Sequence, residues 1–76
     1  MYDYSKLLGA MRAKGISQDQ LAHKISINPA TLNAKLKNNS QFKQQEILDI
    51  MRVLEIPATE IQSYFFAHKL AKTQVS

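Results

Sequence analysis

The sequence predicts an all-α fold, with five helices packed into one compact domain over residues 1–76. Apolar residues recur at intervals of three and four along the chain, which is the spacing of one face of a helix. No stretch alternates apolar and polar residues with the period of two that indicates a strand. Hydrophobic residues make up 45% of the chain and charged residues 21%, a composition typical of a globular domain rather than a disordered segment.

The first two helices are marked by their termini. We expect the first from about Tyr4 to Lys14, with Asp3 as its N-cap and Gly15 as the residue that ends it. Its apolar face consists of Tyr4, Leu7, Leu8 and Met11. A second, short helix follows Ser17, because Ser17-Gln18-Asp19-Gln20 has the pattern of a capping box. Its buried stripe is expected to be Leu21, Ala22 and Ile25.

The third helix is predicted to begin at Asn28-Pro29. Asn caps free backbone N–H groups, and Pro has no N–H to lose at the first helical position. The helix ends near Lys37, before the turn-forming residues Asn38-Asn39-Ser40. Only two residues separate Ile25 from Asn28, so the second and third helices must meet at a sharp angle. We therefore expect a helix-turn-helix over about residues 17–37.

Two further helices complete the predicted fold. The fourth spans Gln44 to Leu54, with Ile47, Leu48, Met51 and Leu54 at helical spacing. Pro57 interrupts the chain, and the fifth begins at Ala58 or Thr59. One face of the fifth segment carries Ile61, Tyr64, Phe65 and His68, with Phe65 and Ile61 expected in the core. Residues 70–76 have no apolar stripe and are expected to fray.

The composition argues against several classes of function. The chain has no Cys, and its longest apolar run is three residues, far below the roughly 18 that a membrane helix needs. His23 and His68 have no Ser or Asp constellation around them, and Glu46 with Asp49 is more typical of a solvated helix face than of a metal site. We expect a cytoplasmic protein that is not an enzyme, with no cofactor, metal, membrane partner or small-molecule substrate.

Positive charge is concentrated in the first half of the chain. The net charge is +4 at pH 7. Through Gln45, seven lysines and arginines face two aspartates, a net +5, whereas the remainder has a net charge of −1. This asymmetry is compatible with a polyanionic partner and equally with simple solubility, so the charge alone does not decide the function.

The sequence resembles the XRE/Cro class of phage and bacterial repressor helix-turn-helix domains. The resemblance rests on Arg12-x-x-Gly15-Ile16-Ser17-Gln18-x-x-Leu21-Ala22-x-x-Ile25 followed by Ile27-Asn28-x-x-Thr31-Leu32. Lys35-Leu36 with Phe42, Glu46-Ile47-x-x-Ile50 and Ile61-x-x-Tyr64-Phe65-Phe66 look like the short Cro-like regulators of phages of Gram-positive bacteria. The resemblance implies a five-helix, lambda-repressor-like domain whose third helix enters the DNA major groove.

We expect a set of DNA contacts on and around the third helix. Leu32 and Leu36 point toward the core, which leaves the opposite face toward the groove. The predicted DNA-binding residues are Ser17, Gln18, Asn28, Ala30, Thr31, Asn33, Ala34, Lys35, Lys37, Asn38 and Lys43. The methyls of the alanines and Thr31 suit thymine C5-methyls, and Asn33 suits adenine, which favours an A·T-leaning half-site.

Bland alternatives exist for each of these contacts. Ser17 can act only as a helix cap, the lysines can be ordinary solvated residues, and specificity can come from DNA shape instead of base contacts. The sequence also departs from the family at Ser26, where the family usually has Gly at the turn. Ser26 must adopt a strained left-handed conformation, or the turn follows another backbone path.

The aromatic run Tyr64-Phe65-Phe66 leads to two hypotheses. A helix cannot bury three consecutive side chains on one stripe, so Tyr64 or Phe66 is a candidate for a homodimer interface, with fold-back onto the first helix as the alternative. The first functional hypothesis is a sequence-specific, double-stranded DNA-binding transcriptional regulator, a phage or prophage Cro-like repressor that binds operator half-sites as a dimer. The alternative is a protein-interaction module on the same fold that binds another regulator through these aromatics.

Overall fold

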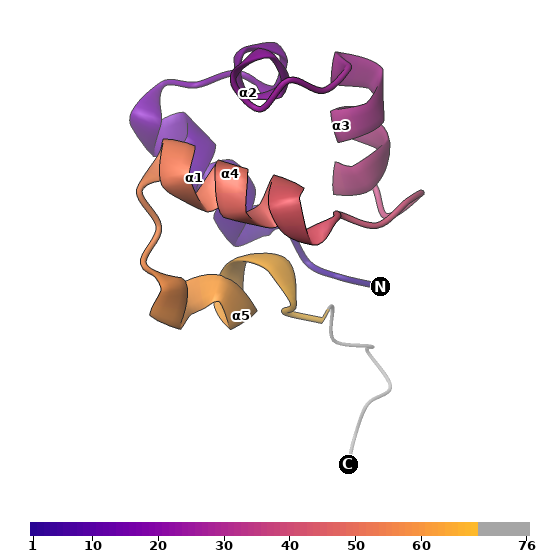
Figure 1. Cartoon of the computed structure of the whole chain (residues 1–76). Helices are drawn as coiled ribbons and strands as arrows, with labels where there is room; N and C mark the ends of the chain where they lie inside the picture. The colour runs from indigo at the N-terminus through magenta and orange to yellow at the C-terminus, as the bar shows by residue number, and fades with distance from the viewer. Residues whose placement is uncertain (69–76) are drawn as a thin grey trace.

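A computed structural model of the chain describes residues 1–68. Its α-helices are α1 (Ser5–Lys14), α2 (Gln18–Lys24), α3 (Pro29–Leu36), α4 (Gln44–Leu54) and α5 (Ile61–Phe65), with a short 3-10 helix, η1 (Ala58–Glu60), before the last (Figure 1). The described residues contain no strand, only an isolated antiparallel bridge between Tyr2 and His68. The compact all-helical prediction is therefore confirmed, and the predicted fraying of residues 70–76 lies outside the described residues.

Local capping chemistry sets the ends of the first three helices. The Oγ of Ser17 accepts from the N–H of Gln20, whose side chain accepts from the N–H of Ser17, so the predicted capping box is confirmed. The Oδ1 of Asn28 accepts from the N–H of Ala30 at 2.8 Å, and Pro29 is the first residue of α3. Gly15 ends α1 at φ 68.

Some predicted boundaries are shifted by a residue or two. The N-cap position of α1 is Tyr4 rather than Asp3, although the Oδ1 of Asp3 accepts from both the N–H and the hydroxyl of Ser5. His68 lies beyond α5, which ends at Phe65. The last turns of a helix are short of partners, so small differences in local packing decide where it stops.

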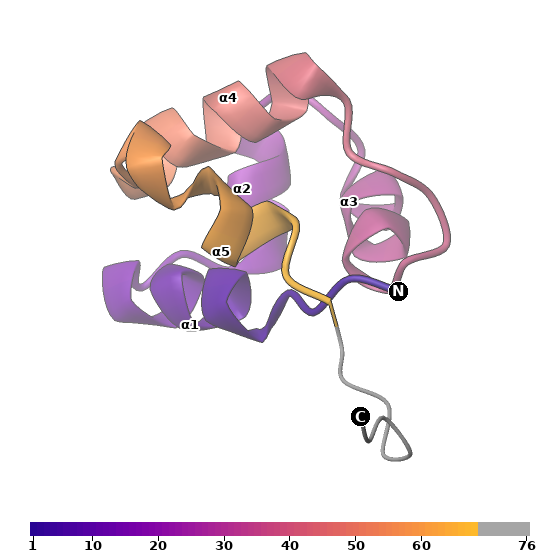
Figure 2. The same cartoon turned by 90° about the horizontal axis from the view of Figure 1, so that it is seen from below.

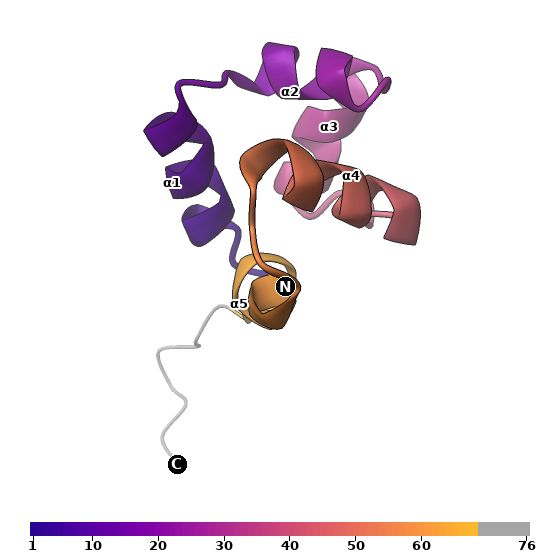
Figure 3. The same ribbon diagram turned by 60° about the vertical axis from the view of Figure 1, so that its left-hand side comes forward.

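The core is built from all five helices. Each contributes one fully buried side chain, and these are Leu7, Leu21, Leu32, Ile50 and Phe65. The short α5 lies between α1 and α4 in Figure 2, and it lies at the opposite end of the molecule from α2 (Figures 1 and 3). Among the described residues, no helix combines the length and the apolar character needed to cross a bilayer.

The predicted inward face of α4 is wrong by one position. Leu48 is 53% exposed, whereas Ile50 is completely buried. The buried residues of α4 are Ile47, Ile50, Met51 and Leu54, which follow the i, i+3, i+4, i+7 spacing. Leu48 lies about 100° around the helix from Ile47, on the edge away from this stripe.

Two turn residues adopt the left-handed conformation that favours glycine. Ser26, between α2 and α3, has φ 61, and Asn38, after α3, has φ 66. The structure thus shows the strained backbone at Ser26 rather than another path. The two residues differ in their side chains. Ser26 is exposed and makes no side-chain hydrogen bond in the described part of the chain, whereas Asn38 bonds the backbone of Tyr2.

Replacing each of these residues by Gly is expected to have opposite effects on stability. Ser26→Gly relieves a left-handed cost of roughly 1–2 kcal/mol and adds chain entropy to the unfolded state, so the free energy of unfolding should rise by up to about 1 kcal/mol. Asn38→Gly relieves the same backbone but removes two hydrogen bonds, so the free energy should fall by about 1 kcal/mol. Urea denaturation of both variants measures the two signs, and equal shifts would contradict the role given to the Asn38 amide.

Candidate nucleic-acid interface

Helix α3 has one buried face and one outward face. It packs chiefly against α2 and lies at an edge of the molecule (Figures 1 and 2). Leu32 is fully buried, as predicted, and Leu36 is half-buried against the core. On the other side Ala30 and Thr31 are exposed, while Asn33 and Ala34 are half-buried. The outward face therefore consists of small side chains and one amide.

The start of α2 contributes one side chain with spare hydrogen-bonding capacity. The capping box uses the hydroxyl of Ser17 as an acceptor, so the capping role of Ser17 is established. Gln18 is half-buried, and its amide has no hydrogen-bond partner in the described part of the chain. The exposed Asn28 uses its side-chain oxygen for the α3 cap, which leaves its amide NH2 as a donor.

Lys35 does not belong to the DNA-facing set. It is 4% exposed, and its Nζ lies 2.6 Å from the Oε1 of Glu46 and 3.1 Å from the backbone oxygen of Gln41. The prediction of a phosphate contact by Lys35 is therefore wrong. The physical reason is its position three residues after Leu32, on the stripe of α3 that faces the core.

The side chain of Asn38 is also engaged within the molecule. Its Oδ1 accepts from the backbone N–H of Tyr2 at 2.8 Å, and its Nδ2 donates to the backbone oxygen of Tyr2 at 2.9 Å. Both polar atoms of the amide are thus occupied, which overturns the predicted DNA contact of this side chain. Its tolerance of positive φ is confirmed.

Lys37 and Lys43 remain exposed. They flank the connection between α3 and α4, which has neither helix nor strand from residue 37 to residue 43. Lys37 makes no ion pair in the described part of the chain, and the only interactions of Lys43 there are through its backbone and through the charge of Glu46. The connection therefore presents two ammonium groups to the solvent.

Glu46 is the half-buried partner of Lys35, not part of a solvated acidic face as expected. Burial on its own raises the pKa of its carboxyl, but the hydrogen bond from Lys35, the hydrogen bond from the N–H of Lys43 and the two lysine charges outweigh it. The pKa of Glu46 therefore lies below its ordinary value. Asp49 instead accepts from Arg52 at 2.6 Å, an exposed pair on the same helix. Residues 1–68 contain no group of three His, Cys, Asp or Glu side chains arranged for a metal ion.

The aromatic residues of the C-terminal end pack within the chain. Phe65 is buried as predicted. Tyr64 is half-buried beneath the Nζ of Lys6, which lies 5.0 Å from its ring centroid, and half-buried Phe66 meets the ring of Tyr2 edge-on at 5.9 Å. These contacts match the fold-back alternative, since Lys6 belongs to α1 and Tyr2 precedes it. An interface role of Tyr64 and Phe66 stays a prediction.

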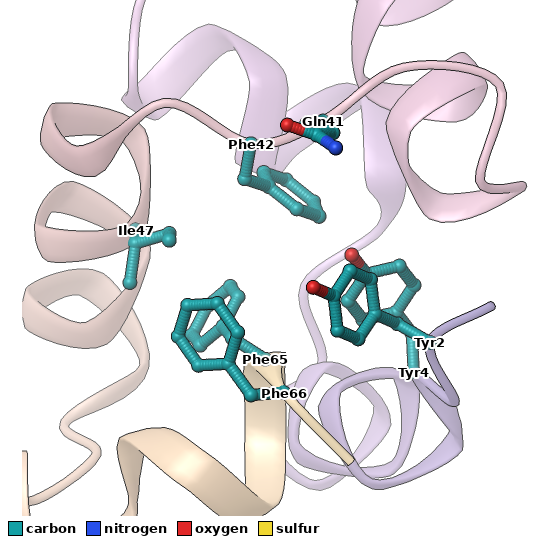
Figure 4. Close-up of a pocket in the computed structure, with 7 residues that line it drawn as sticks. All are labelled: Tyr2, Tyr4, Gln41, Phe42, Ile47, Phe65 and Phe66. Carbon is teal, nitrogen blue, oxygen red and sulfur yellow. The ribbon is translucent and has the colours of Figure 1, made fainter. Parts of the chain in front are cut away.

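A small cavity of about 60 Å³ lies among these aromatics (Figure 4). It is lined by Tyr2, Tyr4, Gln41, Phe42, Ile47, Phe65 and Phe66. The lining brings together the N-terminal segment, the α3–α4 connection, α4 and the C-terminal end. Residues far apart in sequence thus converge directly behind the connection that carries Lys37 and Lys43.

Two comparisons with known proteins bear on the family. A comparison with curated proteins found no match. The family described as "Protein of unknown function (DUF739)" matches residues 1–68, which covers most of the chain. The protein belongs to the DUF739 family.

Proposed function

We propose that the protein is a sequence-specific, double-stranded DNA-binding transcriptional regulator, a Cro-like repressor of phage or prophage origin. The observation that carries this proposal is the outward face of α3, where Ala30 and Thr31 are exposed while Leu32 is completely buried. A helix is about 10–12 Å across with its side chains, and the major groove is about 12 Å wide. Small outward side chains allow such a helix to approach the base edges closely.

In this proposal α2 and α3 form a helix-turn-helix. The two helices pack together at a steep angle, with α2 seen end-on and α3 from the side in Figure 1. The left-handed Ser26 accomplishes the short turn between them. Helix α2 then lies across the DNA backbone, and α3 enters the groove.

Base contacts come from the small side chains and the one amide of α3. Methyl groups of Ala30, Thr31 and Ala34 contact thymine C5-methyls, and Asn33 bonds adenine, which together favour A·T-rich half-sites. Half-buried Asn33 and Ala34 reach bases only at the closest approach of the helix. Preference through DNA shape is the second source of specificity.

Phosphate contacts come from Gln18, Asn28, Lys37 and Lys43. The exposed side chains of the two lysines supply the charge, and the free amide groups of Gln18 and Asn28 supply neutral donors. A homodimer then places two such surfaces on half-sites about one helical turn apart. Removing Lys35 and Asn38 from the set lowers the number of charged contacts to two per protomer.

Binding to a mixed-sequence duplex at low salt tests the proposal. We expect fluorescence anisotropy to show that Gln18→Ala with Lys37→Ala weakens binding about tenfold. Each neutralised phosphate contributes about −0.9 to the slope of log affinity against log salt, so the slope should become shallower by about that amount per protomer. The matched control is Arg52→Ala with Gln62→Ala, which removes the same charge and amide from α4 and α5, away from α3 (Figure 1).

The two variants separate a local surface from general charge attraction. The control should bind within about twofold of the wild-type protein. If the wild-type protein and the first variant bind equally weakly, the regulator proposal is wrong. Sequence specificity is tested by footprinting DNA that flanks the gene of this protein, where protection of paired A·T-rich half-sites is the expected result.

A further inference from the structure

The connection between α3 and α4 is irregular but firmly tied to the rest of the molecule. Residues 37 to 43 form neither helix nor strand. Their outward side chains include Lys37 and Lys43, while other groups of the same segment are bonded inward. A segment with no internal hydrogen-bond ladder keeps one conformation only if such ties hold it.

The first tie lies at the beginning of the segment. Asn38 takes the left-handed conformation at φ 66, and its amide bonds the N–H and the oxygen of Tyr2 across 36 positions of sequence. Tyr2 is itself fixed by its bridge to His68. The start of the connection is thus attached to both ends of the described chain.

The second tie lies at the end of the segment and uses the ion pair between α3 and α4. The Nζ of Lys35 donates to the backbone oxygen of Gln41 at 3.1 Å and to the Oε1 of Glu46 at 2.6 Å. The same Oε1 accepts from the N–H of Lys43 at 2.8 Å. A buried ammonium and a half-buried carboxylate thereby hold the backbone at Gln41 and at Lys43.

Between these ties an aromatic side chain anchors the segment. The ring of Phe42 meets Tyr4 edge-on at 5.4 Å and Phe65 edge-on at 5.6 Å (Figure 4). Phe42 supplies affinity for the core but has no directional bond to the backbone. The directional ties at this end of the connection are those of Lys35 and Glu46.

We infer that Lys35 and Glu46 are positioning residues that hold the α3–α4 connection in the conformation in which Lys37 and Lys43 contact phosphates. The inference rests on the proposed DNA binding. An ion pair shielded from water adds little net stability, because removing two charges from water costs about as much as their attraction returns. Its consequence here is geometric, since a preformed connection avoids the entropy cost of ordering when DNA binds.

The double variant Lys35→Met with Glu46→Gln removes the pair and keeps the rest. It deletes one positive and one negative charge, so the net charge of +4 is unchanged. The amide introduced by Glu46→Gln can still accept from the N–H of Lys43, whereas the thioether introduced by Lys35→Met cannot donate to the oxygen of Gln41. Gln41 is exposed, so water can satisfy that oxygen. The matched control is Asp49→Asn with Arg52→Met, which removes an exposed ion pair of the same charges from α4.

The experiment measures DNA affinity and backbone order together. We expect the double variant to bind the mixed duplex about tenfold more weakly than the wild-type protein, with the same salt slope. Tenfold corresponds to about 1.4 kcal/mol, which is the cost of ordering roughly one residue. Heteronuclear 15N relaxation should show increased motion confined to residues 37–43, and the control should match the wild-type protein in both measurements.

Each other outcome is decisive. If the wild-type protein and the double variant bind equally, or if binding weakens without added motion in residues 37–43, the positioning role is wrong and the proposed function stands. If the wild-type protein does not bind duplex DNA, both proposals fail. Should the double variant not fold, Asn38→Gly releases the same segment at its other end, and wild-type affinity in that variant overturns the inference.

Discussion

Leu32→Ala is expected to lower the free energy of unfolding by about 2–5 kcal/mol. Leu32 is completely buried on the inner face of α3, where this helix meets the core. Truncation removes buried apolar surface and leaves a cavity that the surrounding helices fill only in part. For a domain of this size, the melting temperature should fall by about 10 °C or more, as measured by circular dichroism.

Leu48→Ala is the matched control for this prediction. The substitution is chemically identical, but Leu48 is 53% exposed on α4. We expect a loss below about 1 kcal/mol, since little surface leaves water there and no enclosed cavity forms. If the two variants melt at the same temperature, the inward face of α3 has been assigned incorrectly, and the outward face with it.

Glu46→Gln is expected to lower the free energy of unfolding by about 3 kcal/mol at pH 7, because it leaves the buried ammonium of Lys35 without a counter-charge. Adding Lys35→Met should restore most of that loss, because the double variant has no unpaired buried charge. A thermodynamic cycle of the two single variants and the double variant, measured by urea denaturation, isolates the coupling between the two side chains. Additive effects would show that the pair is not coupled.

The cost of Glu46→Gln should also depend on pH. The pKa of Glu46 is lower in the folded protein than in the unfolded chain. Its stabilisation is therefore fully present above the unfolded value of about 4.3 and is lost as the pH falls through the folded value. The difference between wild type and variant should shrink in acid. Glu55→Gln serves as the control: its partner Lys14 also lowers its pKa, but the Glu55 side chain is 76% exposed, and we expect a small effect at every pH.

Much of the local structure follows from short sequence patterns. The capping box at Ser17, the Asn28-Pro29 start of α3 and the Gly15 stop of α1 all appear where the sequence places them. Each depends on groups no more than about four residues apart, so tertiary packing is not needed to predict it. The inward position of Leu32 follows from helical spacing in the same way.

The candidate interface was only partly predictable. The small outward side chains of α3 and the exposed lysines Lys37 and Lys43 lie where the helical spacing and the sequence order place them. Lys35 was misplaced because a lysine is rarely buried, so its position on the inner stripe was outweighed by its charge. A partner carboxylate eleven residues away, at Glu46, is what makes that burial possible.

The sequence by itself determined which segments are helical, where most of them begin and end, and which side of α3 faces outward. Those features depend on neighbours within one or two helical turns. Only the tertiary structure decided that Lys35 pairs with Glu46, that Asn38 holds Tyr2, and that Leu48 rather than Ile50 faces the solvent. These choices depend on how distant segments meet in three dimensions, and a buried charge or amide is tolerated only where such a meeting supplies its partner.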